Sequence, residues 1–210
     1  MKTDMTKQRI LVWDLPTRLF HWLLAATFAG AWLTAESERW INVHATLGYT
    51  FAGLIAFRLV WGFIGSRYAR FASFVAGPGP VARYLGSILT FRPEHHVGHN
   101  PAGGWAVLAL LGLGLATALS GYAAFTVRAH WLEELHEGVA GAMLALVFVH
   151  IGAVLVSSLI HRENLVRAMW NGFKYGSPAD AIRRKRWIAA GALLALVAGI
   201  WTAAVQGALL

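Results

Sequence analysis

The stretch that decides the fold runs from Leu135 to Ile160 and reads LHEGVAGAMLALVFVHIGAVLVSSLI. It predicts one membrane-spanning helix, because about 20 apolar residues cross a bilayer. His136 and His150 lie fourteen residues apart in it, so both fall on one helix face, about 21 Å apart along the axis. Polar side chains at bilayer depth are costly and mark functional sites by default. Both histidines are therefore candidate metal ligands. The alternative is a pair of core histidines that bond backbone carbonyls.

The composition is that of a membrane protein. The chain is 57% hydrophobic and 13% charged, with a mean hydropathy of +0.54. We predict five membrane spans, which leave no room for a separate soluble domain: 18–35, 43–64, 104–126, 136–160 and 187–207. Basic residues precede the first span as in a signal peptide, but we expect this span to be retained.

Cysteine is absent from the chain. Its absence excludes thiol attachment of c-type haem, cysteine-ligated iron–sulfur clusters and disulfides. Any redox centre here must be held by other side chains.

The basic residues gather on one side of the predicted membrane. The N-terminal segment, the second loop and the fourth loop carry Lys2, Lys7, Arg9, Arg18, Arg67, Arg70, Arg83, Arg92, Arg162, Arg167, Lys174, Arg183, Arg184, Lys185 and Arg186. The other side carries Arg39, Arg128, Glu36, Glu38, Glu133, Glu134 and Glu137. The positive-inside rule then predicts a cytoplasmic N-terminus and an outer C-terminus. The net charge of +8 thus reflects orientation, and nothing else in the chain favours a nucleic-acid partner.

With this topology the histidines can be placed by depth. His21 lies near the cytoplasmic end of span one, and His44 opens span two at the outer surface. His136 opens span four at the outer surface, and His150 lies about 21 Å deeper. His44 and His136 are therefore level, as are His21 and His150. Each pair can supply both axial ligands of one haem.

Arg58 is the other costly residue of the predicted spans. It follows His44 by fourteen residues and lies at the depth of the inner histidine pair. A haem propionate is a natural counter-ion for it. The alternative is a side chain that snorkels to the cytoplasmic interface.

The remaining histidines have simpler interpretations. His161 competes with His150 for the inner position but lies too far along the helix, so we interpret it as interfacial. His95 and His99 have the spacing of a zinc pair, but no third ligand is placed to complete the site. His130, beside Trp131, is interpreted as a headgroup-level residue.

These residues are arranged in motifs that resemble a known family, the bacterial cytochrome b561 and nickel–iron hydrogenase b-type cytochromes. The matching motifs, which cover about residues 10–170, are Trp13-Asp14-x-Pro16-x-Arg18-x-x-His21-Trp22, Val43-His44 with Gly48 and Arg58-Leu59-x-Trp61-Gly62, Gly98-His99-Asn100-Pro101-Ala102-Gly103-Gly104, Leu135-His136 with His150, and His161-Arg162-Glu163-Asn164-Leu165.

The resemblance implies an all-α, polytopic membrane bundle. Residues 1–170 would form a four-helix core with two b-type haems, and residues 171–210 a basic cytoplasmic segment and a fifth transmembrane helix. The implied ligands are His21 with His150 on the cytoplasmic side and His44 with His136 on the periplasmic side. The fifth helix lacks histidine and is expected to pack outside the core or against a partner.

The expected function is electron transfer. Iron with two histidine ligands has no open position for a substrate. The resemblance implies exchange of electrons between the quinone pool of a bacterial inner membrane and a periplasmic partner, such as a c-type cytochrome or a dehydrogenase subunit. An alternative is a self-contained superoxide:quinone oxidoreductase, which the acidic outer loops disfavour. A non-redox transporter would need inverted repeats, which are not visible, and a structural anchor would not explain four level histidines.

Overall fold

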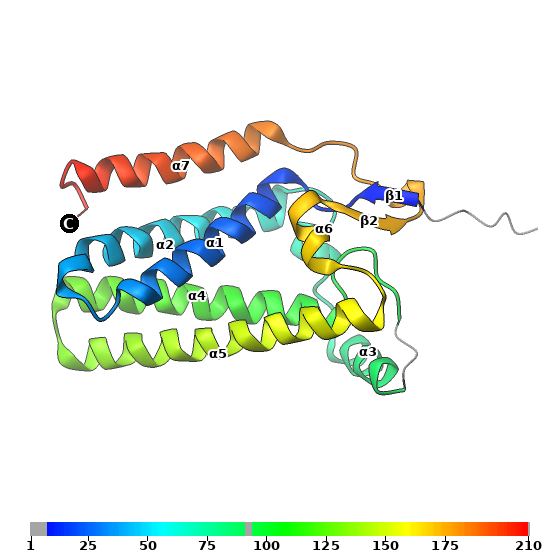
Figure 1. Cartoon of the computed structure of the whole chain (residues 1–210), viewed down its shortest axis with the longest axis horizontal. Coiled ribbons are helices and arrows are strands. Elements are labelled where there is room, and N and C mark those ends of the chain that lie inside the picture. Colours follow the sequence, from blue (N-terminus) through cyan, green and yellow to red (C-terminus); the bar gives the residue numbers. More distant parts are fainter. Residues whose placement is uncertain (1–7, 91–93, 210) are drawn as a thin grey trace, which may run out of the picture. The chain divides into compact units, whose positions relative to one another are not determined.

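The computed structural model describes residues 8–90 and 94–209. Lys2, Lys7 and Arg92, which we predicted to face the cytoplasm, lie outside these residues. The described chain is mainly helical (Figure 1), and its elements are β1 (Gln8–Leu11), α1 (Leu15–Thr34), α2 (Ile41–Ile64), α3 (Pro78–Leu89), α4 (Pro101–Val127), α5 (His130–Ile160), α6 (Leu165–Asn171), β2 (Phe173–Gly176) and α7 (Trp187–Val205).

Four of the five predicted membrane spans are confirmed by length and composition. Helices α2, α4, α5 and α7 are long and apolar enough to cross a membrane. Helix α1 has 20 residues but does not reach the same apolar character, because Arg18 and His21 lie in its first two turns.

The predicted helical fold is confirmed, and the structure adds one small sheet to it. Strand β1 pairs with β2 in an antiparallel two-stranded sheet, with Gln8 opposite Gly176 and Leu11 opposite Phe173. The two strands lie side by side in Figure 1. We had assigned the segment of β2 only as a basic cytoplasmic stretch. Strands of four residues whose partner is far away in the sequence carry too little local pattern to be recognised.

The chain divides into two compact units. The first, here called the basic unit, consists of Met1–Arg18, Val60–Leu108 and Phe148–Arg186. The second, the helical unit, consists of Leu19–Leu59, Ala109–Val147 and Trp187–Leu210.

The basic unit is built around the sheet and the start of α1. Its apolar core consists of Ile10, Val12, Trp13, Tyr68, Ala168 and Ile182. Asp14 is fully buried and begins α1, because its carboxylate accepts the backbone N–H of Thr17 at 2.8 Å. The same carboxylate accepts the indole N–H of Trp61 at 3.1 Å. Two motifs of the sequence, around Asp14 and Trp61, are thus joined by one buried side chain.

The helical unit is a bundle in which small residues let neighbouring helices approach. A Cβ at Gly30 of α1 would lie 3.1 Å from Leu47 of α2. At Gly114 of α4 a Cβ would lie 2.6 Å from Ile55 of α2, and at Gly53 of α2 it would lie 2.9 Å from Ile200 of α7. The bundle therefore packs at membrane-type glycine contacts, and α7 joins it on α2.

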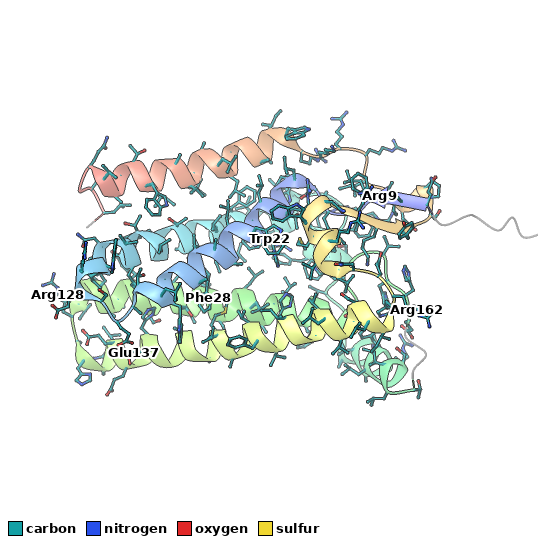
Figure 2. All side chains as sticks on the ribbon, in the orientation of Figure 1. Arg9, Trp22, Phe28, Arg128, Glu137 and Arg162 are labelled. Atoms are coloured by element: carbon teal, nitrogen blue, oxygen red, sulfur yellow. The ribbon has the colours of Figure 1, made fainter. Side chains whose placement is uncertain are left out.

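Most basic residues lie in the basic unit, which also holds Asp14, Glu94, Glu163 and Asp180. The described basic residues of the basic unit are Arg9, Arg18, Arg67, Arg70, Arg83, Arg162, Arg167, Lys174, Arg183, Arg184, Lys185 and Arg186, whereas the helical unit holds Arg39, Arg58, Arg128, Glu36, Glu38, Glu133, Glu134 and Glu137. Figure 2 shows Arg128 and Glu137 at the end of the helical unit where α4 passes into α5.

One detail of the predicted topology needs correction. We placed Glu133 and Glu134 in an outer loop and His136 at the start of its helix. All three lie within α5, which already begins at His130. The connection from α4 to α5 is only Arg128 and Ala129, and Arg128 ends α4 with a positive φ of 54°.

Candidate metal centre

Two of the four predicted ligands, His44 of α2 and His136 of α5, meet in the helical unit. Their ring centroids are 6.2 Å apart and the ring planes are nearly perpendicular, at 84°. Both side chains are half-buried. The two rings that we predicted to lie at the same depth are therefore neighbours, and their role as ligands stays a prediction.

The His44 ring is held by a backbone contact to α1. Its Nδ1 lies 2.9 Å from the carbonyl oxygen of Ala31. A carbonyl can only accept, so Nδ1 carries the proton and donates it. Nε2 then keeps its lone pair, which is the arrangement that a metal-binding imidazole needs.

The His136 ring is held in the same way by a side chain of α4. Its Nδ1 lies 3.1 Å from the hydroxyl of Ser120. That hydroxyl donates its single proton to the carbonyl of Thr117 at 3.1 Å. It must therefore accept from Nδ1, and the lone pair of His136 also resides on Nε2.

Gly121, the next residue of α4, makes room for this ring. A Cβ at that position would lie 2.8 Å from Cε1 of His136, closer than van der Waals contact allows. Glycine therefore permits the ring of His136 to lie against the backbone of α4.

The two rings fit one metal ion between them. Metal–imidazole bonds are about 2.0 Å long, so an ion bound on opposite sides by two imidazoles holds the ring centroids roughly 6 Å apart. The measured 6.2 Å matches this spacing. Gly48, one turn beyond His44, adds open space beside α2, since a Cβ there would meet no atom within 4 Å. Ring spacing, tautomers and space together fit a planar iron macrocycle.

The other predicted site residues are distributed over both units. His21 and Arg58 belong to the helical unit, and His150 belongs to the basic unit. His21 packs edge-on against Trp22 at 5.0 Å, and Arg58 is 3% exposed. The pairing of His21 with His150 therefore stays a prediction, as does the role of Arg58.

The remaining histidines take ordinary positions with one exception. His99 packs between Trp13 and Phe74, at ring distances of 4.7 and 4.5 Å, and His130 is the first residue of α5. Among residues 8–90 and 94–209, no group of three or more His, Cys, Asp or Glu side chains is arranged to hold a metal. His161 is the exception, because it lies in a polar cluster around the buried side chain of Tyr84.

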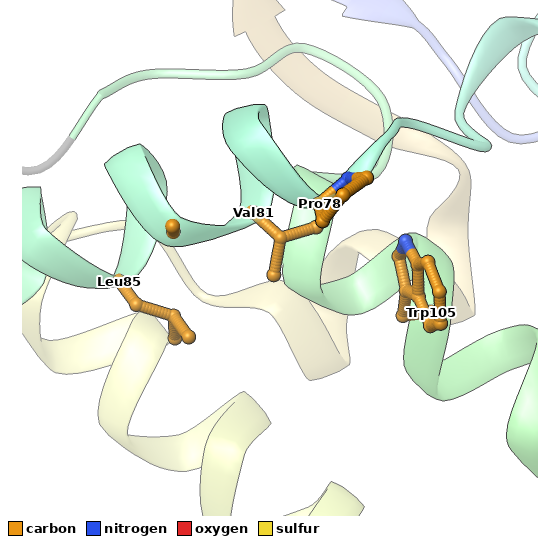
Figure 3. Close-up of a pocket in the computed structure, with 5 residues that line it drawn as sticks. Pro78, Val81, Leu85 and Trp105 are labelled. Carbon is orange, nitrogen blue, oxygen red and sulfur yellow. The ribbon is translucent and has the colours of Figure 1, made fainter.

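The basic unit also contains an apolar pocket, shown in Figure 3. It has a volume of about 270 Å³ and is lined by Pro78, Val81, Ala82, Leu85 and Trp105. The indole N–H of Trp105 donates to the carbonyl of Ala76 at 2.8 Å. The lining offers no free polar group to orient a substrate, so we assign no chemistry to this pocket.

Three supporting residues of the centre escaped the sequence analysis. Ser120 could have been noticed, because a polar side chain within an apolar span is unusual. Gly121 is one of many glycines in the spans, and only the nearby ring distinguishes it. Ala31 acts through its backbone carbonyl, for which a sequence contains no signal.

Comparison with known proteins gives two matches. A family model described as prokaryotic cytochrome b561 matches residues 12–172. A probable Ni/Fe-hydrogenase B-type cytochrome subunit from Rhizobium leguminosarum bv. viciae is 22% identical over 214 residues, which cover 79% of this chain and 89% of the relative. No solved structure matches the chain significantly.

Proposed function

The chain belongs to the prokaryotic cytochrome b561 family, and from this premise we propose that it carries electrons across a membrane between quinone and a redox partner. The family consists of b-type cytochromes of electron transfer, which implies haem b and a membrane location. The haem ligands, the number of haems, the quinone and the redox partner are part of what we propose.

The first proposed haem site lies between His44 and His136. One observation carries this proposal. Each ring is held through its Nδ1, that of His44 by the carbonyl of Ala31 and that of His136 by the hydroxyl of Ser120, and the two ring centroids are 6.2 Å apart. A haem held by His44 and His136 would supply one-electron transfer. Ala31 and Ser120 orient the rings, and Gly121 leaves space for the His136 ring to lie against the backbone of α4.

The second proposed haem site uses His21 and His150. Both are half-buried histidines of predicted spans, and such residues are costly in a membrane unless they have a partner. We assign Arg58 to a propionate of this haem. Its 3% exposure supports that assignment over a side chain that extends to water.

The proposed orientation follows from the charge of the two units. The basic unit faces the cytoplasm, and the glutamates of the helical unit face the periplasm of a bacterial inner membrane. We propose a periplasmic partner with a basic surface, either a c-type cytochrome or a dehydrogenase subunit. The hydrogenase-associated relative supports a partner enzyme. Residues 1–170 form the proposed dihaem part, and residues 171–210 add the basic segment and α7.

Haem content tests the proposal directly. The purified protein should show a b-type reduced-minus-oxidised spectrum with about two haems per chain. His44→Ala and His136→Ala should each remove mainly the outer haem, and His21→Ala and His150→Ala mainly the inner one. Retention of two low-spin haems in any of these variants would overturn the ligand assignment.

A further inference from the structure

A polar cluster lies in the basic unit, around the buried side chain of Tyr84 in α3. Tyr84 is 1% exposed, and its hydroxyl lies 3.4 Å from Nε2 of His161. Ser157 and Asn100 are also close enough to this hydroxyl to lower its pKa. A buried hydroxyl usually finds one acceptor, as Tyr68 does when it donates to the carbonyl of Asp180 at 2.9 Å. Tyr84 instead meets three side chains, each of which can donate and accept.

The cluster lies between the exposed His95 and the face of α5 that carries His150. On one side, the ring of His161 lies 6.4 Å from that of His95, which is exposed. On the other side, Ser157 follows His150 by seven residues of α5, so the two side chains share a helix face about two turns apart. Polar groups therefore reach from the surface to Ser157, about two turns of α5 from His150.

The protonation states suit proton transfer. Burial raises the pKa of Tyr84, so its hydroxyl keeps its proton at neutral pH. Burial, together with Lys174 and His96, lowers the pKa of His161, and Glu163 opposes this effect. His161 is then neutral and ready to accept a proton.

Several other groups face His161. Tyr84 approaches it from α3, and His95 and His96 from the segment before α4. Glu163 lies just after α5, and Lys174 lies on β2, where its ammonium group is bound to Glu163 at 3.2 Å. The charges of Lys174 and Glu163 balance each other, and the histidines and Tyr84 are the groups that can exchange protons.

We propose that Tyr84 and His161 relay protons between water at His95 and the face of α5 that carries His150. The inference rests on the proposed quinone reaction. A quinone that gains two electrons from the reduced protein must also gain two protons, one for each O–H bond of the quinol. In each step Tyr84 passes its hydroxyl proton toward the acceptor by way of Ser157. Tyr84 then takes a proton from His161, and His161 takes one from water.

The test is quinone reduction by the purified holoprotein. The protein is first reduced chemically and then mixed with a short-chain ubiquinone in H₂O and in D₂O, between pH 6 and pH 8. The wild type should show a pH-dependent rate and a solvent isotope effect. Tyr84→Phe should reoxidise at least tenfold more slowly, with unchanged haem content. Tyr68→Phe is the matched control, because it removes a buried hydroxyl that bonds a backbone carbonyl, and it should keep the wild-type rate.

Two further measurements separate a relay from a packing role. His161→Ala should be slow, and added imidazole should restore its rate by replacing the lost base. NMR titration of the histidines, which needs no quinone, should show a changed pKa of His161 in Tyr84→Phe and not in Tyr68→Phe. A Tyr84→Phe variant as fast as Tyr68→Phe, or a His161→Ala variant that imidazole does not rescue, would overturn the relay alone. A wild type that reduces no quinone would overturn the proposed function as well.

Discussion

Replacement of Ser120 by alanine is a sharp test of the outer haem site. Ser120 does not touch the proposed iron, but its hydroxyl accepts the Nδ1–H of His136 at 3.1 Å. In Ser120→Ala this N–H loses its acceptor, and the ring loses the contact that fixes its orientation and tautomer. Ser120 is only 8% exposed, so bulk water replaces the hydroxyl poorly. We expect weaker haem binding at His136 with an intact fold.

The size of the effect follows from the lost bond. A buried donor without an acceptor costs about 1–3 kcal/mol. Since about 1.4 kcal/mol corresponds to a factor of ten in an equilibrium constant, haem affinity should fall roughly 5- to 150-fold. Loss of an outer-shell partner of a metal-binding histidine typically costs about 10- to 100-fold, which lies within this range.

The assay is transfer of haem to excess apomyoglobin, followed optically. It is best performed in a His150→Ala background, where only the outer haem should remain. Thr117→Val is the matched control, because Thr117 is equally buried at 8% exposure and lies on the same helix, but its hydroxyl bonds only the carbonyl of Leu113. If Ser120→Ala held its haem as firmly as Thr117→Val, then Ser120 would not support a ligand and the outer site would need reassignment.

Three other predictions concern the centre and the partner surface. Gly121→Ala should reduce outer haem content more than Ser120→Ala does, because its Cβ would lie 2.8 Å from the His136 ring; full retention of both haems would contradict the site. Arg58→Leu should lower the midpoint potential of the inner haem by tens of millivolts, since removal of a nearby cation destabilises the more negative reduced form, and an unchanged redox titration would refute the assignment to a propionate. Glu133→Lys with Glu134→Lys should slow association with a basic redox partner without changing haem content, and the wild-type rate should fall as salt rises. A rate insensitive to salt and to charge reversal would shift the proposed partner into the membrane.

Much of the architecture could be read from local pattern. Apolar runs of span length predicted α2, α4, α5 and α7, because the bilayer imposes a minimum length on any helix that crosses it. Helix α1 is a helix as predicted but is less apolar than its neighbours, since Arg18 and His21 lie in its first two turns. The charge asymmetry of the loops reappears in the two units of the structure, because like charges were already grouped along the chain.

The sequence by itself determined which residues are candidates: histidines and an arginine at depths where polar groups are expensive. The rise of a helix fixed their depth, and this was enough to pair His44 with His136. Only the tertiary structure decided how these rings are held. Their partners Ala31 and Ser120 lie on other helices, and a local sequence pattern does not indicate which helices pack together. The same holds for strand β1, because its partner β2 lies near the other end of the chain. It also holds for Tyr84, because its polar neighbours lie in segments remote from α3 in the sequence. Local periodicity fixes which side of an element is buried, whereas the identity of the buried partner depends on contacts between segments remote in sequence.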